Sequence, residues 1–224
     1  MFDWRWEFTF EILPRLGWAT LNTLMAAGIG YGIALVLGLV LVLAQRTPFR
    51  PLTLSVRELV EFIRSTPLVL QIFFVFYVGP QVGIRLSPWT AGMIAIGLHY
   101  AAYLSEVYRA GLEGVPRGQW EACKALNLGM RRTYTGIVLP QALPISLPGM
   151  GNYLVGIFKD TPMLSVIGVA ELMHQANAVG SETYRFLEPY TLVGIIFLAI
   201  SLPTAFALRH FEAWVRRALG MTNR

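Results

Sequence analysis

Long stretches without a charged residue divide the chain. Asp, Glu, Lys and Arg are all absent from 16–45, 65–84, 86–105, 133–158 and 189–208. Each stretch reaches the roughly 20 residues that an α-helix needs to cross the hydrocarbon core of a bilayer. The pattern therefore predicts an all-α polytopic membrane protein with five transmembrane helices. The first stretch is not a signal peptide, because a signal core has only about 7–15 apolar residues after a basic start.

The chain is expected to form one transmembrane domain, 16–215, with a short segment at each end. Aromatic residues are frequent in 1–15, and such side chains anchor amphipathic segments at a membrane surface. We therefore expect 1–15 to lie along the external surface. We expect 216–224 to be a cytoplasmic tail and 114–132 to be a longer cytoplasmic loop.

Basic residues are distributed unevenly over the segments between these stretches. They gather after the first, third and fifth stretch, at Arg46, Arg50, Arg57, Arg109, Arg117, Lys124, Arg131, Arg132, Arg209, Arg216, Arg217 and Arg224. The alternate segments hold Arg5, Arg15, Arg85 and Arg185, mostly beside acidic residues. Because cytoplasmic loops carry the excess of Lys and Arg, the N-terminus is predicted outside and the C-terminus in the cytoplasm.

Composition excludes several classes of protein. Hydrophobic residues make up 55% of the chain and charged residues only 14%, against about 25% charged in soluble domains. The net charge of +5 fits the basic cytoplasmic loops, so no nucleic-acid partner is expected. The single Cys123 excludes a disulfide scaffold. No metal site is expected either, because the three histidines are far apart in the sequence.

The predicted cytoplasmic loop has the composition of two short helices around a break. Good helix formers occupy 119–126. Asn127 then favours the left-handed conformation that ends a helix, and Gly129 has the same freedom. Two interpretations remain open at this point. The loop helix lies at the membrane interface, or it docks into a groove on a soluble partner.

Charged residues at membrane depth are rare and mark candidate functional sites. Such residues adjoin two of the charge-free stretches in similar contexts, Arg64-Ser65-Thr66-Pro67 and Lys159-Asp160-Thr161-Pro162. A proline interrupts a helix, and interrupted helices with polar neighbours point to a transport site near the membrane midplane. The alternative is internal pairing, of Arg64 with Glu61 or of Lys159 with Asp160.

These residues suit a zwitterionic solute. Its carboxylate would meet Arg64 or Lys159, and its cationic end would meet Asp160. The hydroxyl groups of Ser65, Thr66 and Thr161 would add contacts. Oppositely charged partners offset a desolvation cost that neither charge would recover alone. No catalytic residue is expected, because HExxH, a GxSG-like nucleophile and paired intramembrane carboxylates are all absent from the sequence.

Several motifs resemble known importers. Glu121, Ala122, Ile137, Leu139 and Pro140 are similar to the EAA loop of bacterial ABC importer membrane subunits, although Cys123 and Asn127 depart from that pattern. The wider resemblance is to the polar amino acid permease family, and it rests on Glu61 to Leu68, Ala102 to Gly111, Val115 to Trp120 and Phe158 to Pro162. His99-Tyr100, Asn152-Tyr153 and Tyr184 to Pro189 are most similar to the ectoine/hydroxyectoine branch.

The resemblance implies a fold, partners and a function. The fold would be a type I ABC importer transmembrane domain with five helices and a cytoplasmic coupling helix. The partners would be an ATP-binding cassette subunit, a second permease subunit, identical or homologous, and an external solute-binding protein. The chain would be the inner-membrane permease of an ATP-driven importer for a polar amino acid or a related zwitterion such as ectoine or hydroxyectoine. The coupling contacts would lie at Gln119, Glu121, Ala122, Asn127 and Gly129.

No cofactor is expected on this chain. A phosphate loop needs lysine directly after glycine, and neither Lys124 nor Lys159 follows one. The resemblance therefore assigns ATP and Mg²⁺ to the partner ATPase, and this chain is not an enzyme. The competing hypothesis is a secondary transporter or channel that works alone on a small polar solute, but it leaves the EAA-like loop unexplained.

Overall fold

The computed structural model describes residues 4–218, and every regular element in this range is helical. Five elements are long enough to form the body of the protein: α1 (Trp6–Gln45), α2 (Arg50–Ser65), α4 (Pro88–Glu113), α7 (Leu139–Asp160) and α9 (Leu187–Ala218). The shorter helices are α3 (Leu68–Phe73), α5 (Arg117–Ala125), α6 (Met130–Thr133) and α8 (Leu172–Thr183), with π-helical turns at Phe74–Val78 and Tyr134–Val138 and 3₁₀ segments at Gly79–Val82 and Thr161–Ile167.

The long helix α4 lies at the centre of the structure. It packs along α1 and also contacts α7, and α7 in turn contacts α9. Two glycines allow close approach of α1 and α4. A Cβ at Gly97 would lie 2.6 Å from a side-chain carbon of Ile33, and one at Gly38 would lie 3.0 Å from Leu104. Small residues at such crossings let helices pack tightly in a membrane, where apolar burial does not drive their association.

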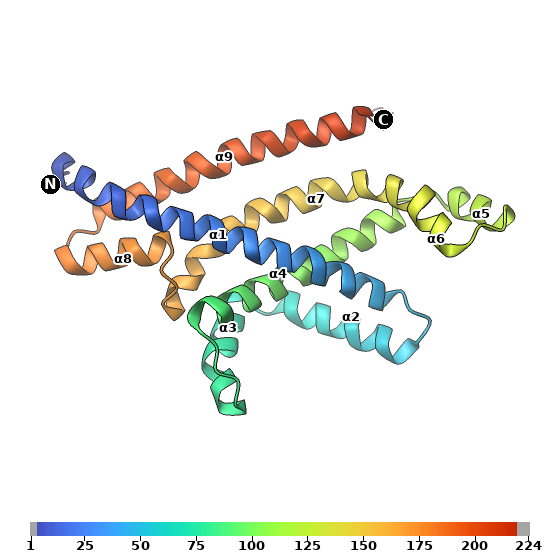
Figure 1. Ribbon diagram of the computed structural model, residues 1–224, viewed down its shortest axis with the longest axis horizontal. Coiled ribbons are helices and arrows are strands. Elements are labelled where there is room, and N and C mark those ends of the chain that lie inside the picture. Colours follow the sequence, from blue (N-terminus) through green and yellow to red (C-terminus); the bar gives the residue numbers. More distant parts are fainter. Residues whose placement is uncertain (1–3, 219–224) are drawn as a thin grey trace.

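The long helices lie side by side along the longest axis of the molecule (Figure 1). The start of α1 and the short helix α8 are at one end. The helices α5 and α6 and the C-terminal part of α9 are at the other end. The helix α3 projects sideways from the body. The helix α8 and the helices α5 and α6, which were predicted to lie on opposite sides of the membrane, are thus at opposite ends of this axis (Figure 1).

Two helix pairs are sharply bent. The bend between α2 and the segment Leu68–Val82 is 108°, and the bend between Met130–Ile167 and α8 is 47°. By length and composition, α1 and α9 can each cross a membrane, and up to four crossings result when each bent pair counts as one. The prediction of five crossings requires α4 as well, whose polar residues lower its hydropathy. The all-helical class agrees with the sequence, and the count of five stays a prediction.

The predicted boundary at residue 15 has no counterpart in the structure. Helix α1 begins at Trp6 and continues through Pro14 to Gln45 without a break. Residues 6–15 are therefore the first turns of the long helix, and their position along the external surface stays a prediction. Residues 1–3 of that segment and 219–224 of the predicted tail lie outside the described residues.

The helix α8 is joined to α1 by polar contacts. Arg15 donates two hydrogen bonds to Glu182, of 2.6 and 2.9 Å. This guanidinium holds the pKa of the Glu182 carboxyl below its usual range. At the start of α8, the Thr23 hydroxyl accepts from the Leu172 amide at 3.0 Å. These contacts fix α8 against the first half of α1.

Candidate functional site

Arg64 lies in the last turn of α2, directly before the break at Thr66-Pro67. Its guanidinium is 3.4 Å from a carboxylate oxygen of Glu61 and 3.8 Å from one of Glu106. It also lies over the ring of Tyr103, with 5.5 Å between Cζ and the ring centroid. The expected pairing with Glu61 is therefore present, at long distance. The buried Nε of Arg64 has no hydrogen-bond partner among the described residues.

Asp160 is the last residue of α7, where the helix tightens into the 3₁₀ segment. Its Oδ2 accepts a hydrogen bond of 2.7 Å from the hydroxyl of Tyr100 on α4. The expected pairing with Lys159 is absent from the part of the chain that the structure describes. Neighbouring residues near a helix end point in different directions, so the two side chains reach different helices.

Four aromatic rings lie between Arg64 and Asp160. They belong to His99, Tyr100 and Tyr103 of α4 and Tyr153 of α7. The Tyr100 and Tyr103 ring centroids are 6.4 Å apart. Because Tyr103 contacts Arg64 and Tyr100 contacts Asp160, neighbouring turns of one helix face connect the two charged residues. We call these four rings the aromatic cluster.

The segments after the two breaks also meet. Helix α3 contacts the 3₁₀ segment Thr161–Ile167, and Leu68 and Ile72 share one buried core with Leu164 and Ile167. The two Thr-Pro motifs are almost one hundred positions apart in the sequence, and the structure brings their downstream segments together beside α4. The two motifs are therefore followed by segments that pack against each other.

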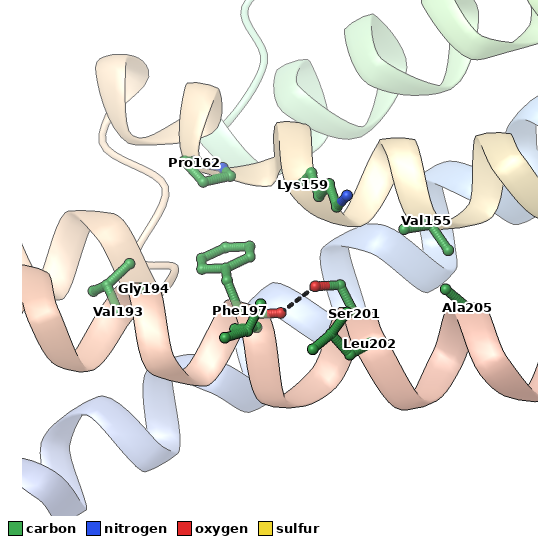
Figure 2. Close-up of a pocket in the computed structure, with 10 residues that line it drawn as sticks. Val155, Lys159, Pro162, Val193, Gly194, Phe197, Ser201, Leu202 and Ala205 are labelled. Atoms are coloured by element: carbon green, nitrogen blue, oxygen red, sulfur yellow. Dashed lines mark hydrogen bonds between the residues drawn. The ribbon is translucent and has the colours of Figure 1, made fainter.

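Lys159 occupies a groove between α7 and α9 (Figure 2). Two adjoining cavities of about 440 and 330 Å³ share Lys159, Val155 and Ala205 in their walls. The first is mostly apolar and includes Phe197, and the second includes Asn152, Arg209 and Glu212. The Lys159 ammonium makes no ion pair or hydrogen bond with another described residue, which leaves all its donors available.

The predicted hydroxyl contacts are largely committed to the backbone. Thr66 donates to the Phe62 carbonyl at 2.7 Å, and Thr161 donates to the Phe158 carbonyl at 2.8 Å. Ser65 is exposed. Thr66 is half-buried and can still accept a hydrogen bond from a solute, but it has no free proton to donate. Thr161 is fully buried, so the predicted contact of its hydroxyl group with a solute is not available in this structure.

The predicted coupling loop forms the exposed helix α5. Gln119, Glu121 and Ala122 are exposed on it. Asn127 has a φ of 52°, so it adopts the expected left-handed conformation. Gly129 instead has an extended backbone, with a φ of −62° and ψ of 151°, so its conformational freedom is not used here.

Apolar side chains anchor this loop and also cover its tip. Cys123 is buried, and Trp120 packs edge-on against Tyr134 at 5.6 Å. Leu126 and Met130 remain 71% and 72% exposed on either side of Asn127. Exposed apolar side chains on a fixed turn suit contact with another protein.

Sequence reasoning missed the residues that join the charged groups. Tyr100, Tyr103 and Tyr153 were noted only as parts of family motifs, and Gln71 was not considered. The spacing of Tyr100 and Tyr103 places them on one face of a helix. That spacing, inside a charge-free stretch, was the available indication of a polar helix face.

Comparison with known proteins identifies the family. Residues 29–217 match the model for binding-protein-dependent transport system inner membrane components. The chain is 42% identical to the probable amino-acid ABC transporter permease protein y4tG of Sinorhizobium fredii, over 90% of this chain and 87% of that protein. It is 34% identical to the probable glutamine ABC transporter permease protein GlnM of Bacillus subtilis, over 85% and 88%.

A solved structure agrees with these relatives. The chain is similar to a protein whose structure is described as an amino acid ABC transporter with histidines, with a TM-score of 0.89 and 29% identity over 95% of this chain and 99% of that chain. The family match covers most of the sequence, and the structural match covers the same helices. The chain therefore belongs to the family of binding-protein-dependent transport system inner membrane components, as an ABC importer permease subunit of the amino-acid branch.

Proposed function

We propose that this permease moves a small zwitterionic solute, and that the solute is bound beside the two helix breaks. The observation that carries the proposal is the placement of Arg64 and Asp160 against Tyr103 and Tyr100 on one face of α4. A cation and an anion held at neighbouring turns match the two charged ends of an amino acid. Charges at membrane depth need such partners.

Lys159 offers a second contact for a carboxylate. It lies in the groove against α9, whereas Tyr153 of the same helix packs against the aromatic rings of α4. The groove volume of about 440 Å³ is within the usual range for ligand pockets. We propose that the solute carboxylate meets Lys159 or Arg64 at different stages of its passage.

The solute class is a polar amino acid or a related zwitterion, and ectoine or hydroxyectoine is the specific candidate. The motifs His99-Tyr100 and Asn152-Tyr153 support that candidate. In the structure His99, Tyr100 and Tyr153 belong to the aromatic cluster, and Asn152 lines the groove. Aromatic faces attract cationic groups, so the rings of Tyr100 and Tyr153 favour a solute with a delocalised positive charge.

Transport is driven by ATP on a partner chain that contacts α5. The exposed residues Gln119, Glu121, Ala122 and Asn127, with Gly129 after them, form the proposed coupling surface. A short helix with an exposed apolar tip can dock into a groove of a soluble subunit. Replacing Glu121 with a bulky residue should dissociate the ATPase or uncouple hydrolysis from transport, and membrane insertion should survive.

The remaining parts of the assembly follow from the family. The chain would cross the membrane five times, with the N-terminus outside, and pair with a second permease subunit. An external solute-binding protein would deliver the solute at the end that carries α8. The separation of α8 from α5 along the long axis supports this arrangement (Figure 1).

The test is uptake into proteoliposomes that contain the full complex. L-Histidine, L-glutamine and ectoine are supplied outside with the solute-binding protein, with and without ATP inside. ATP-dependent uptake of at least one is expected. Uptake without the ATPase subunits would instead support a transporter or channel that works alone. Failure to take up any zwitterion from the panel would refute the proposed solute class.

A further inference from the structure

The break between α2 and α3 leaves backbone carbonyl groups without their usual helical donors. Pro67 has no N–H, so the carbonyl of Ile63 loses the donor four residues later. The Leu70 amide bonds the carbonyl of Pro67 at 3.1 Å and does not serve the carbonyl of Thr66 in the α-helical pattern. Water cannot replace these donors inside a bilayer, so the protein has to supply them.

The side chain of Gln71 supplies them. Its Nε2 donates to the Ile63 carbonyl at 2.8 Å and to the Thr66 carbonyl at 3.0 Å. The Thr66 amide adds a longer bond of 3.3 Å to Ile63. Both hydrogens of the Gln71 amide are used in this way. The side chain therefore bridges the break from the α3 side and holds the bend.

The oxygen of Gln71 connects the break to α4. Its Oε1 lies 3.2 Å from Nδ1 of His99. An amide oxygen can only accept, so Nδ1 of His99 carries the hydrogen. His99 is 8% exposed, and its ring lies 5.1 Å from that of Tyr103 between centroids. This bond therefore selects one tautomer of His99.

The same helix end holds Arg64. The Tyr103 hydroxyl donates to the Arg64 carbonyl at 3.2 Å, which is another carbonyl left open where α2 ends. Gln71 and Tyr103 together satisfy the last turn of α2 from two sides, and His99 holds Gln71 in place. The position of the Arg64 side chain thus depends on donors that lie outside its own helix.

We propose that Gln71 and His99 form a latch, with His99 as the Nδ1–H tautomer, that positions Arg64 for the solute. Both are positioning residues, because they act through the bend and not by touching the solute. The role toward the solute rests on the proposed function. The hydrogen bond and the tautomer do not depend on any solute.

The tautomer is tested on the full complex in lipid by ¹⁵N solid-state NMR at neutral pH. The His99 signal is identified as the one absent from the His99→Asn variant. A signal with protonated Nδ1 and unprotonated Nε2 is expected. The reverse tautomer would overturn the latch, because Gln71 would then face a nitrogen with no hydrogen.

The positioning role is tested by uptake of radiolabelled L-histidine, L-glutamine and ectoine. Gln71→Leu keeps the size of the side chain and removes its donors, so the apparent KM should rise about tenfold, with a smaller change in maximal rate. The control is Gln81→Leu, since Gln81 is exposed in the 3₁₀ segment after α3, and its KM should not change. Equal KM values for the two variants would refute the positioning role.

Two conservative variants of His99 separate the latch from simple packing. In His99→Asn the side-chain nitrogen lies near the former Nδ1 and can donate to Gln71, so the KM should stay within about twofold of wild type. In His99→Gln the amide extends toward the former Nε2, so the KM should rise as in Gln71→Leu. Equal losses in both variants would overturn the latch. If the wild-type complex takes up none of the three probes, the proposed solute class fails, while the NMR result still decides the latch.

Discussion

The role of Asp160 gives the sharpest test of the proposed solute site. Its carboxylate lies at the end of α7 and accepts a 2.7 Å hydrogen bond from Tyr100. Replacing it with Asn removes the charge and keeps an oxygen that can still accept from Tyr100. If Asp160 binds the cationic end of the solute, Asp160→Asn should greatly reduce uptake while the complex still assembles.

The loss expected in Asp160→Asn can be compared with the loss expected in Tyr100→Phe, because Tyr100 donates to the same carboxylate. A hydrogen bond to a charged group contributes about 1.5–3 kcal/mol, and about 1.4 kcal/mol corresponds to a tenfold change in affinity. Asp160→Asn should therefore raise the apparent KM by about 10- to 100-fold. Tyr100→Phe removes the hydroxyl donor but leaves the carboxylate, so a rise of only a few-fold is expected.

The order of the two losses separates the alternatives. If Asp160 only accepts the bond from Tyr100, then Asn can still accept it, and Tyr100→Phe should be at least as harmful as Asp160→Asn. The assay is uptake of L-histidine, L-glutamine and ectoine by the reconstituted complex, with assembly checked by co-purification of the ATPase. A loss of uptake in Tyr100→Phe at least as large as the loss in Asp160→Asn would refute the contact between Asp160 and the solute.

A substitution of Lys159 provides a further control for the role of Asp160. The sequence left open a pair between Lys159 and Asp160, in which case Lys159→Met would restore uptake in the Asp160→Asn variant. In the structure Lys159 lies in the groove against α9, so no restoration is expected. Recovery of uptake and selectivity in the double variant would show that the two residues are a structural pair.

Three other outcomes are expected. Asn127→Val should weaken the coupling of ATP hydrolysis to uptake, because a β-branched residue is strained at a φ of 52°, whereas Asn127→Gly should keep the coupling. The measurement is the ratio of ATP hydrolysed to solute taken up in each variant. Gly111→Ala should lower the melting temperature of the complex, because a Cβ there would lie 2.9 Å from a carbonyl oxygen of α7 and overpacking costs about 1–3 kcal/mol of stability. Gly17→Ala, with nothing within 4 Å of the added Cβ, should not lower it. Cysteines introduced in 112–130 should react only from the cytoplasm and those in 174–184 only from outside, and reversed labelling would contradict the orientation.

The charge-free stretches predicted much of the fold because membrane helices are constrained strongly. A helix that crosses a bilayer needs about 20 apolar residues whatever it packs against. The stretches 16–45 and 189–208 accordingly fall within α1 and α9. The stretch 65–84 also marked the right region, but its first residue ends α2, and the rest is divided between α3, a π-helical turn and a 3₁₀ segment.

The direction of the chain after Pro67 was not predictable from composition. A proline indicates that a helix is interrupted, and it does not say by how much the axis turns. The 108° bend depends on which donors satisfy the open carbonyl groups. Gln71 and Tyr103 supply them, and they come from two different helices.

The sequence predicted the charged residues of the site but not the side chains that contact them. Arg64 and Asp160 were recognised because charge is rare at membrane depth. Their partners were not, because Tyr100 and Tyr103 are ordinary residues in an apolar helix until a neighbouring helix places a polar group against them. The direction of Lys159 was equally open, since adjacent residues at the end of α7 contact different helices.

The hydrogen bonds of the site also indicate which groups remain for a solute. Inside a bilayer a polar group without a partner is costly, so most donors beside the two breaks are already used, including the hydroxyls of Thr66 and Thr161. Among the described residues, the Nε of Arg64 has no hydrogen-bond partner, and the ammonium of Lys159 lies unpaired in its groove. Both are cationic groups, which suits the carboxylate of the solute. Asp160 can bind the cationic end and still keep the bond from Tyr100, because Tyr100 donates to only one of the two carboxylate oxygens. Recognition of the cationic end should therefore survive Tyr100→Phe better than Asp160→Asn.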